Sequence, residues 1–85
     1  MSFKIESFMI ERLGLSGNDL VLYAYLYDVT KGGERMYEGN HRNLVSVLNC
    51  TIPTVYKVLA NLEVNGLIVR EPHCKAARIT VVKQT

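Results

Sequence analysis

Long apolar segments are missing from this sequence, and no apolar run approaches the roughly 20 residues that a membrane-spanning helix needs. The opening Met1-Ser2-Phe3-Lys4 is not followed by the long apolar core of a signal peptide. We therefore expect a cytoplasmic protein without a membrane partner. Cysteine is scarce as well, and Cys50 and Cys74 fit that compartment as free thiols. A single disulfide between them stays open as the alternative.

The motifs of catalysis and of metal binding are also missing. His41, His73 and the two cysteines form no C-x-x-C or H-x-x-x-H pair, so their spacing matches no zinc motif. The segment Lys31-Gly32-Gly33 lacks the frame of a glycine-rich phosphate-binding loop. No serine or cysteine nucleophile has a suitably spaced base, and the carboxylates are scattered. We therefore expect neither enzyme activity, nor a metal, nor a cofactor.

What is present indicates one small folded domain with an uneven charge. The chain has 85 residues, of which 48% are apolar, and this fits a single domain with a thin core. The net charge is +2, yet residues 1–40 hold four basic and six acidic residues, whereas residues 41–85 hold six basic and two acidic ones. A basic C-terminal half favours a polyanionic partner, with an ordinary solvated surface as the alternative.

The clearest pattern lies in residues 51–67, where apolar residues at helical spacing predict an amphipathic helix with the stripe Val55, Val58, Leu59 and Leu62. We expect the Thr51 hydroxyl to accept a hydrogen bond from the first turn as an N-cap. At the other end, Gly66 predicts a Schellman cap across which Leu62 and Leu67 touch. The sequence therefore predicts both the start and the end of this helix.

The opposite face of this helix has a different character. A helical wheel places outward Pro53, Lys57, Ala60 and Val64, and at the flanks Thr54, Tyr56 and Asn61. The N-terminal half of that face offers small, aromatic and basic groups, and its only charge is positive. Such a face suits a helix that enters a DNA groove.

Two upstream segments are expected to be helical and strongly apolar. Residues 7–13 predict a short helix, and residues 17–29 a longer one that begins with Ser16 and Asp19 as a weak capping box. The longer helix is apolar on nearly all sides, which indicates burial on more than one side. The short segment must dock either on the domain core or on a second copy. Together the two segments are the expected homodimer surface.

The middle of the chain predicts a helix-turn-helix. Residues 34–38 are compatible with a small edge strand or a loop. Asn40 is the expected N-cap of a short helix over residues 41–48, whose apolar residues recur at helical spacing. A short turn separates this helix from the one that begins after Thr51. Two helices joined in this way are the helix-turn-helix arrangement.

The C-terminal segment alternates apolar and polar residues as a β-hairpin does. Residues 67–71 and 78–83 predict its strands, and residues 72–76 its turn. Its tip and outer face carry Arg70, His73, Lys75 and Arg78. A basic hairpin after a helix-turn-helix is a wing. The single domain thus has an N-terminal extension (1–14), a helical core (16–66) and a wing hairpin (67–83).

These residues resemble a winged helix-turn-helix DNA-binding domain. Thr-Ile-Pro-Thr-Val at 51–55 and Asn-Gly-Leu-Ile-Val-Arg at 65–70 are similar to the recognition helix and its exit in bacterial transcription regulators. Residues 8–24 are similar to the start of helix-turn-helix domains of phage, plasmid and mobile-element replication or regulatory proteins. The resemblance covers nearly the whole chain. It implies an α+β winged helix that binds double-stranded DNA in transcriptional regulation or in mobile-element replication.

Particular side chains are then expected to contact DNA. The groove-side candidates are Thr51, Thr54, Tyr56, Lys57 and Asn61. Asn61 suits an adenine edge, and Thr54 suits a thymine methyl group or a phosphate. Phosphates are expected to be held by Arg42, Lys75 and Arg78. The exposed helix face lacks arginine, the commonest reader of guanine, and this argues against strong sequence specificity.

A protein-interaction adaptor without DNA binding is the alternative function. Winged helices also dock on proteins through the same face, and the sparse charge of the recognition helix favours this interpretation, whereas the basic wing opposes it. A continuous positive surface that joins Lys57 to the other basic candidates would favour DNA. An apolar patch around Tyr56, Ala60 and Val64 would favour a protein partner.

Overall fold

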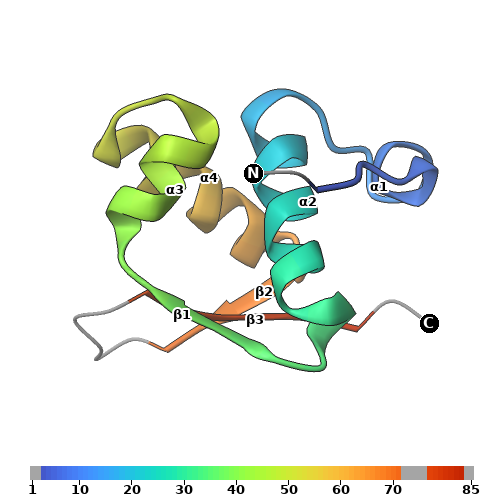
Figure 1. The fold of residues 1–85 in the computed structure, drawn as a ribbon. Coiled ribbons are helices and arrows are strands. Elements are labelled where there is room, and N and C mark those ends of the chain that lie inside the picture. The colour runs from blue at the N-terminus through green and yellow to red at the C-terminus, as the bar shows by residue number, and fades with distance from the viewer. Residues whose placement is uncertain (1–2, 72–76, 84–85) are drawn as a thin grey trace.

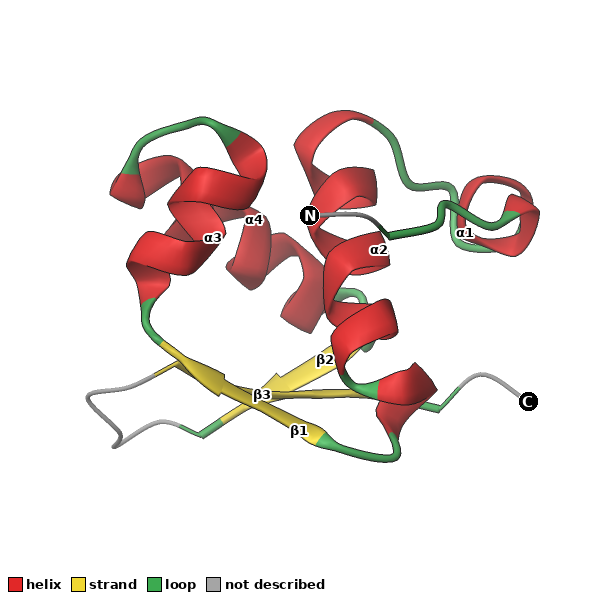
Figure 2. Cartoon of the chain, in the orientation of Figure 1, coloured by secondary structure: helices red, strands yellow, loops and turns green. Residues whose placement is uncertain are grey.

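The computed structural model describes residues 3–71 and 77–83. Its helices lie on one side of a small sheet (Figure 1 and Figure 2). In chain order the elements are α1 (Ser7–Glu11), α2 (Gly17–Val29), the 3₁₀ turn η1 (Lys31–Gly33), β1 (Met36–Gly39), α3 (His41–Leu48), α4 (Ile52–Val64), β2 (Ile68–Arg70) and β3 (Ala77–Val81). From α2 onward this order is that of a winged helix, which confirms the predicted α+β fold. Among the helices described, none is both long and apolar enough to cross a membrane.

The strand β3 forms the centre of the sheet, although it comes last in the sequence. The strand order is β1-β3-β2, and β3 pairs antiparallel with both neighbours. Tyr37 lies opposite Ile79, and Ile68 lies opposite Val81, so these buried side chains share the face beneath the helices. Residues 34–38, which the sequence left open between strand and loop, therefore contribute to the edge strand β1.

The core forms where the helices meet this face of the sheet. Its fully buried residues include Leu22, Tyr23, Ala24 and Leu26 of α2, Leu44 of α3, the stripe Val55, Leu59 and Leu62 of α4, and Ile68, Ile79 and Val81 of the strands. The predicted apolar stripe of α4 is thus confirmed. Since this stripe faces the core, the opposite face of α4 is left at the surface.

The N-terminal segment packs on the tyrosines of α2. The rings of Phe3 and Tyr25 meet edge-on with their centroids 5.7 Å apart, and the centroids of Phe8 and Tyr27 are 5.4 Å apart. Met9 of α1 is fully buried. Part of the surface that we assigned to a homodimer is therefore covered within one chain, and the homodimer stays a prediction.

The helix α1 ends at Glu11, short of the predicted residue 13. Gly14 adopts a φ of +67°, and its N–H donates to the Ile10 carbonyl at 3.1 Å. The helix therefore ends two residues earlier than predicted, and the chain turns back toward α2. Such a left-handed residue is a usual way to end a helix.

Local signals predict the capping of two helices. Asn40 caps α3 because its Oδ1 accepts a hydrogen bond from the Asn43 N–H at 3.1 Å. At the end of α4, Gly66 adopts a φ of +73°, and its N–H donates to the Glu63 carbonyl at 3.0 Å. The Leu67 N–H donates to the Leu62 carbonyl, also at 3.0 Å. These two bonds form the predicted Schellman cap.

Two other predicted capping bonds are wrong. Thr51 precedes α4, but its hydroxyl makes no cap bond and lies 3.1 Å from the Thr54 hydroxyl, which offers it another polar partner. Ser16 precedes α2 and also makes no side-chain cap bond. Gly17 enters that helix with a φ of +59°, so the first turn lacks the geometry of a capping box.

Candidate nucleic-acid interface

The N-terminal half of α4 lies at the surface of the molecule, next to α3 (Figure 1). Ile52 is 38% exposed and Tyr56 is 47% exposed, and both Pro53 and Lys57 are exposed as well. A helix-turn-helix uses this part of its second helix to reach the base edges in the major groove. The structure thus brings Tyr56 and Lys57, two of the predicted site residues, to the expected surface.

The two threonines of the predicted site lie at the start of α4. Thr51 is exposed and Thr54 is half-buried, and their hydroxyl oxygens are 3.1 Å apart. This contact leaves each hydroxyl able to bond a further partner, because a hydroxyl both donates and accepts. Asn61 is exposed in the C-terminal half of α4, farther from the helix start.

His41, the first residue of α3, joins Tyr56 at this surface. The centroids of the two rings are 4.7 Å apart, with an angle of 46° between their planes. Burial, and then the positive charge of Arg70, hold the pKa of His41 below its usual value. Sequence reasoning considered His41 only as a metal ligand. The available signal was its position directly before Arg42, at the start of the first helix of the helix-turn-helix.

Arg42 and Lys57 carry the available positive charge of the two helices. Both side chains are exposed, and within residues 3–71 and 77–83 neither one has an ion-pair partner. Arg42 follows His41 in α3, and Lys57 follows Tyr56 in α4. These two charges are therefore free to interact with a polyanion.

The C-terminal half of α4 differs from its N-terminal half. Val64 is 85% exposed, and Glu63 is bound to Arg70 at the end of β2. Arg70 donates from Nε and Nη2 to the Glu63 Oε1 at 3.2 and 2.9 Å. This ion pair ties the end of α4 to the end of β2 and offsets the positive charge of Arg70.

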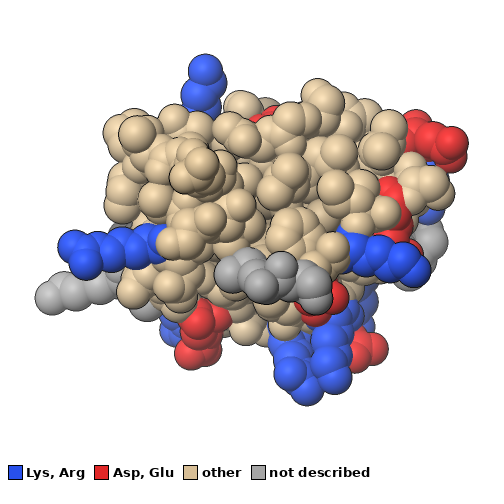
Figure 3. Space-filling view, turned by 45° about the horizontal axis from the view of Figure 1, so that its top comes forward, with Lys and Arg blue, Asp and Glu red and all other residues tan. Residues whose placement is uncertain are grey.

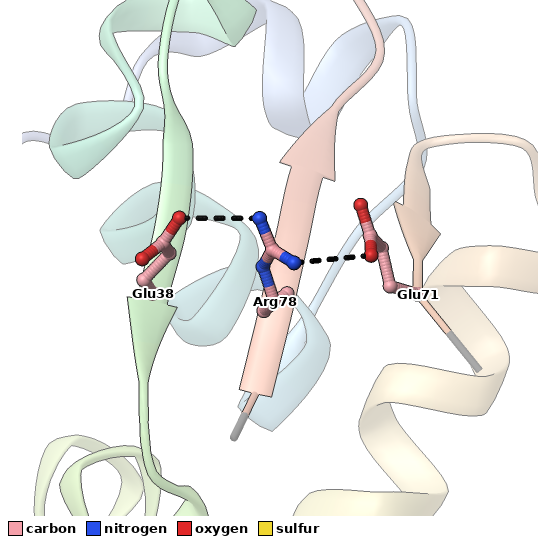
Figure 4. A network of polar contacts seen from close by, with 3 residues as sticks. All are labelled: Glu38, Glu71 and Arg78. Atoms are coloured by element: carbon pink, nitrogen blue, oxygen red, sulfur yellow. Dashed lines mark hydrogen bonds and ion pairs between the residues drawn. The ribbon is translucent and has the colours of Figure 1, made fainter. Parts of the chain in front are cut away.

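Arg78 lies on the outer face of the sheet between two carboxylates (Figure 4). Its Nη2 is 3.4 Å from the Glu38 Oε1, and its Nη1 is 3.3 Å from the Glu71 Oε2. The three side chains form a row from β1 across β3 to the residue after β2. All are partly exposed, so solvent weakens the pairs. The predicted phosphate contact of Arg78 stays a prediction, and its charge is shared with two acids.

Residues 72–76, predicted to form the turn of the wing, lie outside the described residues, and with them the predicted site residue Lys75 and the thiol of Cys74. Cys50, in the turn before α4, is half-buried and free, and its Sγ lies 3.5 Å from the Thr51 carbonyl oxygen.

The helical side of the molecule shows most of its acidic and basic side chains around the rim, with other residue types at the centre (Figure 3).

Comparisons with known proteins identify the fold of the chain. No protein-family model matches the sequence, and no curated protein matches it. A solved structure described as "N-Terminal domain of DNA binding protein" is similar with a TM-score of 0.73 and 17% identity, over 100% of this chain and 76% of that one. Another, described as "Structure of Rep-DNA complex", has a TM-score of 0.71 and 16% identity over the same shares. The similarity supports the winged-helix fold.

Proposed function

We propose that this domain binds double-stranded DNA through α4 and the hairpin of β2 and β3. The observation that carries the proposal is the pair of exposed basic side chains, Arg42 and Lys57, that have no ion-pair partner within the described part of the chain. They stand next to the Tyr56–His41 contact, where a helix-turn-helix meets the major groove. The descriptions of both similar structures mention DNA, which supports the same function.

In this mode the N-terminal half of α4 leads into the major groove. Thr51, Thr54, Tyr56 and Asn61 face the base edges, whereas Lys57 and Arg42 bind backbone phosphates and set the register. The wing, with Lys75 and Arg78, follows the neighbouring backbone. Phosphate contacts release counterions, so the logarithm of the affinity falls with the logarithm of the salt concentration by about 0.9 for each phosphate neutralised. Binding of this kind needs neither catalysis nor a cofactor.

The biological setting of this binding is transcriptional regulation or the replication of a mobile element. The similarity to a chain in a Rep–DNA complex supports the second setting. A homodimer would place two α4 helices on paired half-sites. Ile5 and Ile10 of the N-terminal segment, 45% and 51% exposed, supply an apolar contact for it. A sedimentation experiment that finds only monomer at high micromolar concentration removes the homodimer from the proposal.

A protein adaptor is the second candidate function, and one observation favours it. The surface of α4 carries the exposed apolar residues Ile52, Tyr56 and Val64. Exposed apolar side chains on a surface helix suit a protein partner. A pull-down in which Tyr56→Ala loses a specific partner, while the protein binds no duplex, would select this function over DNA binding.

The test is a fluorescence-anisotropy titration of a mixed-sequence duplex at two salt concentrations. We expect salt-sensitive binding that Lys57→Ala weakens, because one phosphate contact is lost. Lys83→Ala is the matched control, since it removes an exposed lysine beyond the end of β3, outside the helix-turn-helix. Absence of binding at low salt contradicts the proposal, as does an equal loss in the two variants.

A further inference from the structure

The start of α4 is apolar at the point where a recognition helix reads bases. Ile52 and Tyr56 are 38% and 47% exposed, and they stand four residues apart, which places them on one side of the helix. Pro53 beside them is exposed as well. Ile52 stands three residues before Val55 and seven before Leu59, so it continues the buried stripe to the start of α4, and Tyr56 lies beside it at the edge of that stripe. The exposed parts of the two side chains are available for a contact outside the domain.

The major groove presents one apolar group, the C5 methyl of thymine, among hydrogen-bond donors and acceptors. The side chain of Ile52 carries no polar atom, so it cannot bond to those donors and acceptors. It can only bury hydrocarbon. Each methyl group that leaves water in such a contact strengthens binding by about fourfold, on the usual gain per buried methylene. The structure describes every residue of α4. Lys57 is the only basic residue among them, and none is arginine.

We propose that α4 reads thymine: Ile52 and the ring of Tyr56 contact the C5 methyl groups of thymine in the major groove. The inference rests on the proposed binding to DNA and assigns a base preference to that same surface. In this mode Ile52 determines base specificity. It was not among the residues predicted from the sequence, where Thr54 was the candidate for a thymine contact. His41 supports the reading surface, because its ring lies 4.7 Å from that of Tyr56.

The experiment compares two duplexes that differ only in this methyl group. One is an alternating adenine–thymine duplex, and the other carries deoxyuridine at every thymine. We expect the thymine duplex to bind more tightly, by about fourfold for each methyl that is buried. Ile52→Ser should show a smaller difference between the two duplexes, because the ring of Tyr56 alone then contacts the methyl groups. A second pair of guanine–cytosine duplexes, with and without 5-methylcytosine, restores the methyl on the same groove edge and should show a gain.

Matched variants separate a base reader from a general contact. Val64→Ser removes a more exposed apolar side chain at the other end of α4 and should keep the thymine preference. Lys57→Ala should weaken binding to the thymine and uracil duplexes by the same factor, because phosphates do not differ between them. Thermal unfolding of Ile52→Ser checks that the exposed substitution leaves the fold intact.

The outcomes distinguish this inference from the proposed function. Equal affinity for the thymine and uracil duplexes, with binding that still depends on Lys57 and on salt, overturns the thymine preference and leaves DNA binding in place. A thymine preference that is undiminished in Ile52→Ser overturns the role of Ile52. The absence of binding to every duplex at low salt overturns the proposed function, and the inference falls with it.

Discussion

The basic residues of the helices and those of the sheet stand in different surroundings. In the described part of the chain, Arg42 and Lys57 have no ion-pair partner, whereas Arg70 and Arg78 lie against carboxylates. A carboxylate beside an arginine cancels much of the field that a distant polyanion would feel. The number of basic residues in a sequence therefore overstates the positive charge that the folded protein presents.

The acidic and the basic half of the sequence are not separate in the folded chain. Glu38 belongs to the acidic half, yet it binds Arg78 of the basic half because β1 and β3 are neighbours in the sheet. The fold thus places an acidic residue of the first half beside a basic residue of the second half in the sheet. Arg42 and Lys57 of the helices keep exposed charges without a carboxylate partner in the described part of the chain, and we expect them to contribute more to the binding of DNA than Arg70 and Arg78.

Removal of the two helical cations should have the largest effect. We expect the double variant Arg42→Ala/Lys57→Ala to lose about a hundredfold in affinity, from about tenfold for each charge-assisted contact. The slope of log affinity against log salt should become shallower by about two. Anisotropy titrations over a range of salt measure both quantities. An unchanged slope would show that neither residue touches a phosphate.

Removal of Arg78 should have a smaller effect than removal of Lys57. Arg78→Ala deletes a charge that Glu38 and Glu71 already offset, so we expect a loss of about threefold, within the range of exposed ion pairs. The two single variants are titrated side by side with the same duplex. An equal loss in both would mean that Arg78 leaves its carboxylates when DNA binds.

Removal of the two carboxylates that pair with Arg78 should strengthen the binding of DNA. The double variant Glu38→Gln/Glu71→Gln keeps the size of both side chains and removes their charges, so we expect affinity to rise about threefold at low salt. Its free energy of unfolding should change by less than about 1 kcal/mol, because the pairs are exposed. Glu34→Gln, an exposed acid ahead of β1, is the matched control and should change the affinity less. Reduced affinity in the double variant would contradict the comparison.

The smallest effect concerns pH and His41. Burial and Arg70 hold the pKa of His41 low, so the folded chain binds this proton less readily than the unfolded chain. The free energy of unfolding should therefore be largest above about pH 6.5, the usual pKa of histidine, and should decrease slightly as the pH falls below that value. Thermal unfolding of the wild type and of His41→Gln, between about pH 5 and about pH 8, brackets the usual histidine pKa. It measures how much of the pH dependence of stability comes from His41. Greater pH sensitivity in the variant would exclude His41 as the cause.

Features that depend on a few neighbouring residues could be predicted from the sequence. Gly66, with Leu62 and Leu67 around it, contains the whole signal for the Schellman cap that ends α4. Asn40 likewise marks the start of α3 by a bond within one turn. The apolar stripe of α4 has a regular period, so its buried face was also predictable.

Features that depend on distant partners could not be predicted. Residues 34–38 were undecided because the hydrogen bonds of β1 come from β3, far along the chain. The contact between His41 and Tyr56 exists only once α3 and α4 pack together. The ion pair of Glu38 and Arg78 depends on the same strand pairing. The exposed face of α4 was predictable, whereas the partners that surround it were not.

The central position of β3 determines when the sheet can form during synthesis. Within the described sheet, β1 and β2 bond to β3 and not to each other. Translation delivers both outer strands first, and each must wait without a partner strand until residues 77–81 leave the exit tunnel. Tyr37 and Ile68, which β3 helps to bury, stay accessible to chaperones during that interval. Synthesis of the last strand therefore decides when the nascent chain can complete its sheet.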